Sequence, residues 1–217
     1  NDQDMRATGK VLQKLLATSA ELYRDLFQNE LTECNWEHLG LLFVFKTEEE
    51  FQAYAPVNDM LSNEFETPPT VLDGHQLTQI EPTLKEGLAG AYHYLMDGHI
   101  RPNRLMAAWR RRLESLGVEI RERCEVRELI MENGAGRGIR TSDGEIAPAA
   151  FVLAAGAWSP QLTKSLGCSL PIQPGKGYSI TMSRPAQCPR IPMILEEYHV
   201  AITPFHDGYR IGSTMEF

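Results

Sequence analysis

The chain has 217 residues, 42% of them hydrophobic, which is enough to bury the core of one domain or two. Its 21 basic and 29 acidic residues give a net charge of −8, which argues against a nucleic-acid partner. No apolar run approaches the length of a transmembrane helix, and no charged-then-apolar segment opens the chain, so neither a membrane span nor a signal peptide is predicted.

The first part of the chain predicts helices around one buried strand. Apolar residues at helical spacing indicate a long amphipathic helix over residues 5–29, whose apolar stripe needs a surface to cover. The run LGLLFVF (39–45) predicts a buried strand. Thr47 followed by Glu50 is the pattern of a capping box, which begins a second helix that bends or breaks near Pro56.

The next part predicts a strand and a helix. The two prolines at 68–69 mark a loop, and residues 89–95 predict a strand. Apolar residues on one face indicate a helix over about residues 103–115, which Gly117 ends. A short strand is expected over residues 118–121.

A meander of antiparallel strands follows. Its strands are expected over residues 125–131, over residues 137–141 and after the turn at Asp143–Gly144. The glycines of NGAGRG (133–138) have the spacing Gly-x-Gly-x-Gly, which lacks the next position of a dinucleotide-binding turn. With Asn133 before them, they indicate a hairpin turn instead.

The segment FVLAAGAWSP (151–160) predicts an interior strand of a parallel sheet that ends at Ala155–Gly156 before a helix. Because Gly156 has no Cβ, the backbone there could approach a ligand closely, as the wall of a cofactor site does. An ordinary strand-ending turn is the alternative. After Gly167, prolines separate β-type runs at residues 178–182, 199–203 and 209–215, which favours an antiparallel sheet.

Several ordered motifs together resemble the FAD-dependent D-amino-acid oxidase family, from about Leu39 to the C-terminus. The block KGYSIT (176–181) is most similar to the bacterial D-amino-acid dehydrogenase branch, with glycine oxidase next. The other motifs that carry the resemblance are DGHIRP (97–102), CEVREL (124–129), FVLAAGAWSP (151–160) and YRIGSTMEF (209–217).

The resemblance implies an α/β fold, α+β overall. We expect residues 96–168 to form part of a two-dinucleotide-fold FAD domain with a three-stranded antiparallel meander. Residues 1–95 and 169–217 are expected to form a substrate domain with a mainly antiparallel sheet and flanking helices. Members of the family begin with a strand, a Gly-x-Gly-x-x-Gly turn and a helix that hold the FAD pyrophosphate. This chain lacks that unit, so we expect it to be a central portion of a longer protein.

Cofactor-binding residues follow from the resemblance. Val126 matches the meander strand that presents its backbone to the adenine of FAD, although an ordinary core valine is equally compatible. Ala154, Ala155 and Gly156 match the turn of small residues near the diphosphate and ribose. Trp158 is expected either to cap that cavity or to pack between helix and sheet. We expect the chain by itself to bind FAD weakly or not at all, because it supplies only one wall.

The resemblance also addresses the substrate. Met215 matches a substrate-pocket methionine of the glycine oxidase branch, whereas Ala201 stands where glycine oxidase has a pocket tyrosine, which puts that enzyme's specificity in doubt here. The family's carboxylate-binding arginine lies beyond Phe217, and Arg210 is better interpreted as a solvent-facing strand residue than as a substitute.

The implied reaction is oxidation of an amino acid, either a D-amino acid or a glycine-like amine, by hydride transfer to FAD. The imino acid then hydrolyses to a keto acid and ammonia. No catalytic side chain is predicted, because the cofactor carries the difficult step. No metal site is predicted either, since the four cysteines are widely spaced and indicate reduced thiols in a cytoplasmic protein.

A location at the inner face of the membrane is an alternative to the cytoplasm, and the oligomeric state is not predicted. The alternative function, from a different class, is a cofactor-free ligand-binding or interaction module that retained the sheet.

Overall fold

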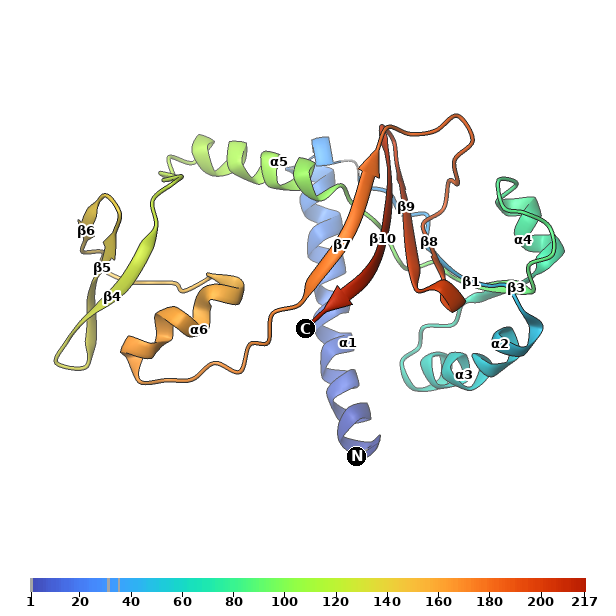
Figure 1. The fold of residues 1–217 in the computed structure, drawn as a ribbon, viewed down its shortest axis with the longest axis horizontal. Helices are drawn as coiled ribbons and strands as arrows, with labels where there is room; N and C mark the ends of the chain where they lie inside the picture. Colours follow the sequence, from blue (N-terminus) through green and yellow to red (C-terminus); the bar gives the residue numbers. More distant parts are fainter. Residues whose placement is uncertain (1, 31, 35) are drawn as a thin grey trace. The chain divides into compact units, whose positions relative to one another are not determined.

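The computed structural model describes residues 2–30, 32–34 and 36–217 (Figure 1). The chain divides into two compact units, residues 1–113 with 177–214 and residues 114–176 with 215–217. The strands form a seven-stranded and a three-stranded sheet, which confirms the mixed α and β fold class. No helix in the described ranges combines the length and the apolar character needed to cross a membrane.

The first unit is built on the seven-stranded sheet, whose strand order is β2-β3-β1-β8-β9-β10-β7. Strand β1 pairs antiparallel with β3 on one side and parallel with β8 on the other. Segments far apart in the sequence therefore share one sheet. The strands are β1 (Leu41–Phe45), β2 (Thr70–Asp73), β3 (Gly90–Tyr94), β7 (Lys176–Met182), β8 (Met193–Leu195), β9 (Val200–Phe205) and β10 (Gly208–Glu216).

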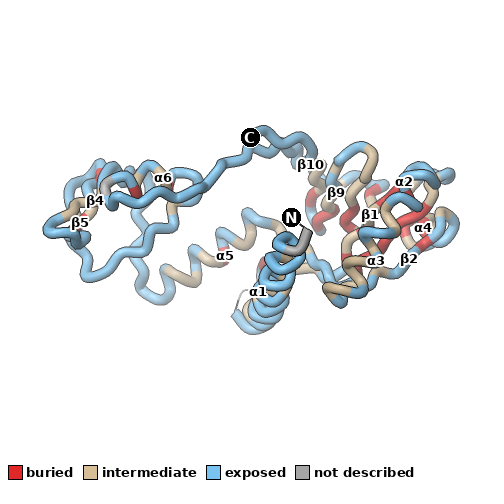
Figure 2. The backbone as a smooth tube through the Cα atoms, turned by 90° about the horizontal axis from the view of Figure 1, so that it is seen from below, coloured by how far each residue is buried: buried red, intermediate tan, exposed pale blue. Residues whose placement is uncertain are grey.

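The two faces of this sheet have different cores, and buried residues gather around its central strands (Figure 2). Because side chains alternate along a strand, Leu42 and Val44 lie on one face, where Leu77 of α4 (Gly74–Ile80) packs with them. Phe45 and Tyr92 lie on the other face, in an aromatic cluster with side chains of α2 (Glu48–Ala53) and α3 (Ala55–Glu64).

The predicted helix start at Thr47 is confirmed, but its capping box is only half formed. The Thr47 hydroxyl accepts a hydrogen bond from the Glu50 N–H at 3.4 Å. The N–H groups of Lys46 and Thr47 donate instead to the Glu197 carboxylate, at 2.6 and 3.0 Å. A tertiary contact thus replaces the local bond that the Glu50 side chain was expected to make. The expected break occurs between α2 and α3, at Tyr54.

The segment after the two prolines holds elements that the sequence analysis missed. β2 is followed directly by α4, whose N-cap Asp73 accepts from the Gln76 N–H at 2.8 Å while the Gln76 side chain accepts from the Asp73 N–H at 3.0 Å. This reciprocal capping box was readable as Asp-x-x-Gln in the sequence. β8, which has only three residues, was missed as well.

Two long helices were predicted and are confirmed, α1 (Asp2–Asn29) and α5 (Pro102–Ser115). Phe27 of α1 and Ala108 of α5 are buried together with Cys34, the last residue of the short helix η1 (Thr32–Cys34). The expected apolar stripe of α1 remains largely uncovered, because Val11, Leu15 and Leu16 are exposed.

The second unit contains the predicted antiparallel meander of β4 (Val126–Glu132), β5 (Ala135–Thr141) and β6 (Gly144–Ile146). Asn133 and Gly134 both have positive φ, at 52° and 76°, as the hairpin turn requires. A short helical segment follows, with η2 (Gly156–Trp158), α6 (Ser159–Leu162) and η3 (Thr163–Leu166).

Two strand predictions in this unit are wrong. Residues 118–121 and 151–155 have no strand structure, and Val152 is 92% exposed. An interior strand needs hydrogen-bonded neighbours on both sides, and no strand in the described part of the chain pairs with residues 151–155. An apolar sequence by itself therefore did not produce a strand here.

A buried carboxylate fixes the approach to β8. Glu81, which follows α4, is fully buried, and its Oε2 accepts from the N–H groups of Arg190 and Ile191 at 2.7 and 3.1 Å. Its Oε1 accepts from the Thr83 hydroxyl at 2.9 Å. The loop before β8 is thereby held against the end of α4.

We expect Glu81→Ala to lower the free energy of unfolding by about 3 kcal/mol or more, because it leaves buried N–H donors unsatisfied. Glu81→Gln keeps one oxygen to accept from the two backbone N–H groups, but it loses the charge and replaces the oxygen that accepts from Thr83, so its cost should be smaller, about 1 kcal/mol. Urea denaturation of both variants measures the difference. The exposed Glu86→Gln is the control, and equal losses for the two Glu81 variants would contradict this account.

Candidate functional site

The second unit holds a cavity of about 680 Å³ with a mainly apolar lining. One wall is the meander, where Val126 and Leu129 of β4 contribute. The segment of residues 148–155 forms another, and Leu162 of α6 contributes a third. Three of the predicted cofactor residues, Val126, Ala154 and Ala155, therefore line the same cavity although they are far apart in the sequence.

The backbone beside Val126 is irregular. Val126 pairs with Thr141 and Glu128 pairs with Arg140, so Arg127 is an extra residue on β4 with no partner in the ladder. Such a β-bulge leaves backbone groups outside the sheet hydrogen bonds, and bulges are frequent beside binding sites. The apolar wall of the cavity therefore ends at Val126, beside an irregular point of the sheet.

Gly156 does not line this cavity, but its backbone has a special conformation. Its φ is +52°, in the left-handed region, and a Cβ built there would meet no atom within 4 Å. A side chain at this position would be disfavoured by the backbone alone, and the space around it is open. Trp158 is 68% exposed and also lies outside the cavity lining, so both of its predicted roles stay predictions.

The predicted substrate residues lie on the sheet. Met215 of β10 is 65% exposed and follows Thr214, whose φ of +50° interrupts the regular strand. Ala201 of β9 is opposite Ile194 on one side and Gly212 on the other. Met215 is not among the residues that line the cavity, and its substrate role stays a prediction.

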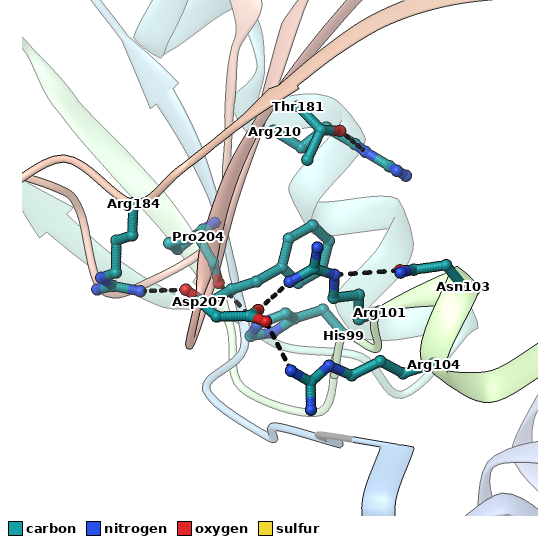
Figure 3. Close-up of polar contacts among 10 residues, drawn as sticks. His99, Arg101, Asn103, Arg104, Thr181, Arg184, Pro204, Asp207 and Arg210 are labelled. Atoms are coloured by element: carbon teal, nitrogen blue, oxygen red, sulfur yellow. Dashed lines mark hydrogen bonds and ion pairs between the residues drawn. The ribbon is translucent and has the colours of Figure 1, made fainter. Parts of the chain in front are cut away.

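A cluster of charged residues fixes the turn between β9 and β10 (Figure 3). The Asp207 carboxylate accepts from Arg104, in the first turn of α5, at 2.6 Å and also pairs with Arg101, which directly precedes that helix. The hydrogen bond from Arg104, with the charges of both guanidinium groups, lowers the pKa of Asp207. This contact ties the hairpin to α5. This contact was not predicted from the sequence, because the partners are about a hundred residues apart and no local pattern marks them.

Arginines also hold the strands around this turn. Arg210 of β10 donates to the Thr181 hydroxyl at 2.9 Å, and its guanidinium lies 5.7 Å from the centre of the Phe205 ring. Arg184 donates to the Phe205 carbonyl at 2.6 Å. Arg210 therefore links β10 to β7, and Arg184 fixes the end of β9.

His99 is largely buried behind the same hairpin. Its Nε2 donates to the Pro204 carbonyl at 3.1 Å and lies 3.8 Å from a Glu37 carboxylate oxygen. Its Nδ1 is buried and has no hydrogen-bond partner in the described part of the structure. Burial lowers the pKa of His99, although the Glu37 charge and the bond to Pro204 oppose that shift. The fold thus favours the neutral ring.

Comparison with known proteins identifies the family. The family model described as "FAD dependent oxidoreductase" matches residues 3–217. The chain belongs to the FAD-dependent oxidoreductase family. This confirms the resemblance found in the sequence.

Relatives within the FAD-dependent oxidoreductase family include a D-amino acid dehydrogenase of Rhizobium rhizogenes, 33% identical over 186 residues. That alignment covers 82% of this chain and 44% of the relative, so the chain spans less than half the length of this relative. Solved glycine oxidases of Geobacillus kaustophilus and Bacillus cereus match with TM-scores of 0.83 and 0.82, at 25% and 24% identity. Both alignments cover 94% of this chain, and they cover 55% and 56% of those structures.

The lowered pKa of His99 predicts a pH-dependent stability. His99 takes up a proton near pH 6.5 in the unfolded chain, whereas the folded chain disfavours this protonation. The contribution of His99 to the free energy of unfolding is therefore complete above about pH 6.5 and is lost as the pH falls below that value. We expect His99→Gln to reduce the loss of unfolding free energy between about pH 7.5 and about pH 5.5. Urea denaturation at the two pH values measures it. An unchanged pH dependence would show that His99 does not titrate on unfolding.

Proposed function

We propose that this chain forms the substrate-binding part, and one wall of the cofactor site, of an enzyme that oxidises an amino acid. The substrate is a D-amino acid or a glycine-like amine, and the product is an imino acid that hydrolyses to a keto acid and ammonia. The family match over residues 3–217 carries this proposal. The first compact unit is the candidate substrate domain, and the second holds the candidate FAD wall. The cytoplasm, or the inner face of the membrane, is the proposed location.

The cavity of the second unit fits part of an FAD molecule. Its volume of about 680 Å³ and its apolar lining suit a flat ring system. The backbone of Val126, beside the bulge at Arg127, would hydrogen-bond to the edge of such a ring. When bound, FAD accepts the hydride from the carbon that carries the substrate amine. The residues of this chain would orient the cofactor there and exclude water.

A substitution at Gly156 tests whether this segment forms a wall of the FAD site. In a flavoprotein of full family length that contains this chain, we expect Gly156→Val to weaken FAD binding by about tenfold or more, because a side chain would occupy the open space beside residues 154–155. Its backbone strain should also cost roughly 1 kcal/mol of stability. FAD titration of the apoprotein and thermal unfolding measure the two effects separately.

Gly134→Val is the matched control, since Gly134 also has positive φ and open surroundings but lies in the hairpin turn. It should lose similar stability and bind FAD normally. If Gly156→Val also bound FAD normally, Gly156 would be a turn residue only.

Reduction of the flavin by amino acids, measured with and without a substitution at Met215, tests the proposed reaction and the proposed substrate site. In the same full-length flavoprotein, we expect one or more D-amino acids or glycine to bleach the flavin absorbance under anaerobic conditions. Met215→Ala should change the preference among substrate side chains more than it changes FAD retention, because a flexible thioether fills irregular apolar pockets.

Met106→Ala, an equally exposed methionine on α5, is the control and should leave the preference unchanged. Absence of bleaching by any amino acid would reject the proposed function. Bleaching with an unchanged preference in Met215→Ala would reject only the role of Met215.

A further inference from the structure

A second cavity lies on the aromatic face of the seven-stranded sheet, within the first unit. It has a volume of about 190 Å³ and lies between the sheet and α3, which contributes Leu61. The rings of Phe43, Tyr54 and Tyr94 form its walls, and Asp97 stands at its edge. It is separate from the cavity proposed for FAD, which belongs to the other unit.

The aromatic walls form a fixed arrangement. The rings of Phe43 and Tyr54 are stacked with centroids 5.8 Å apart, and Tyr94 meets Phe43 edge-on at 5.4 Å. The hydroxyl oxygens of Tyr54 and Tyr94 are 3.3 Å apart, so one hydroxyl donates to the other. Because each hydroxyl oxygen keeps lone pairs, the pair can still accept hydrogen bonds from a guest.

The surroundings of this cavity are negatively charged. Asp97 is an exposed residue at the rim of the cavity and is the one acidic side chain in its described lining. Partial burial of its carboxylate raises the pKa of Asp97, and the nearby His38 opposes this shift. Burial, the bond to Tyr94 and the Glu196 charge all raise the pKa of Tyr54.

We propose that this cavity binds a small organic cation, an alkylammonium group. The faces of aromatic rings attract cations, and an ammonium group would form a charge-assisted hydrogen bond to the Asp97 carboxylate at the rim. The volume allows only a few non-hydrogen atoms, which fits an ammonium group with a short alkyl chain. An anion would face the Asp97 carboxylate and the negative ring faces, so the same chemistry excludes it.

Such a cation has two sources, a free amine or the ammonium end of a basic amino acid side chain. Both present the same group to the rings and to Asp97. The proposal does not depend on the flavin reaction, so it can be tested on this chain by itself.

The probe is n-propylammonium chloride, added at constant ionic strength, with the ring signals of ¹³C-labelled tyrosine followed by NMR. We expect saturable shifts of Tyr54 and Tyr94, while neutral n-propanol of similar size gives much weaker ones. Asp97→Asn should weaken binding by about tenfold or more, because it removes the charged partner. Glu49→Gln removes an exposed acid of α2 and is the matched control, with binding unchanged.

Thermal unfolding verifies that each variant is folded. The comparison of propylammonium with propanol on the unaltered chain decides the proposal even if Asp97→Asn fails to fold. Absence of saturation, equal shifts with propanol, or undiminished binding by folded Asp97→Asn would overturn it. A titration with D-lysine then separates the sources: binding at least as tight as that of propylammonium assigns the site to a side chain, and weaker binding assigns it to a free amine.

Discussion

The parallel pairing of β1 with β8 is the interaction on which the first unit depends. It joins residues 41–45 to residues 193–195, and the Leu42 N–H adds a bond to the Pro192 carbonyl at 2.9 Å. Closing so long a loop costs conformational entropy, which local propensity cannot offset. The cost is met by burial, because Leu42 and Met193 are both completely inaccessible to solvent. The buried Glu81 carboxylate contributes by fixing the loop that precedes β8. Strands β9, β10 and β7 then continue the sheet from β8, so their position follows from this pairing.

The polar contacts around the β9–β10 turn have a positioning role that follows from the same sheet. Asp207 attaches the turn to the start of α5, and Arg210 attaches β10 to β7. Exposed ion pairs contribute little to stability individually, so their effect here is to restrict geometry. His99 behind the hairpin adds a buried bond to the Pro204 carbonyl. The strand that carries Met215 is therefore held at its turn by charge and along its length by hydrogen bonds.

The sequence predicted the elements whose evidence is local. The periodic apolar residues of α1 and α5 and the Asn133–Gly134 turn are specified within a few residues, and each was found where expected.

The predictions that failed have non-local causes. Residues 151–155 have the apolar character of an interior strand, but no described strand pairs with them. The capping box expected at Thr47 is only half formed, because the Thr47 N–H donates to the carboxylate of Glu197, about 150 residues away. The cavity at Asp97 and the arginines around Asp207 gather side chains from distant segments, so no spacing in the sequence marks them. Three of the predicted cofactor residues do meet in one cavity, but that grouping came from the family resemblance and not from their spacing.

The alternation of side chains along the strands gives the sheet of the first unit one face used for packing and a second face that is packed by aromatic rings only in part. Leu42, Val44 and Met193 lie on the side of α4 and are used entirely for packing. One position along, the strand register places Phe43, Ile194, Ala201 and Gly212 side by side on the opposite face. The large rings at the Phe43 end of this row enclose the small cavity, whereas Ala201 and Gly212 at the other end have small or no side chains. A bulky residue at position 201 would fill that space. The sheet therefore offers an aromatic, enclosed end and an open end on the same face, and the difference between them follows from the sizes of the residues that one register brings together.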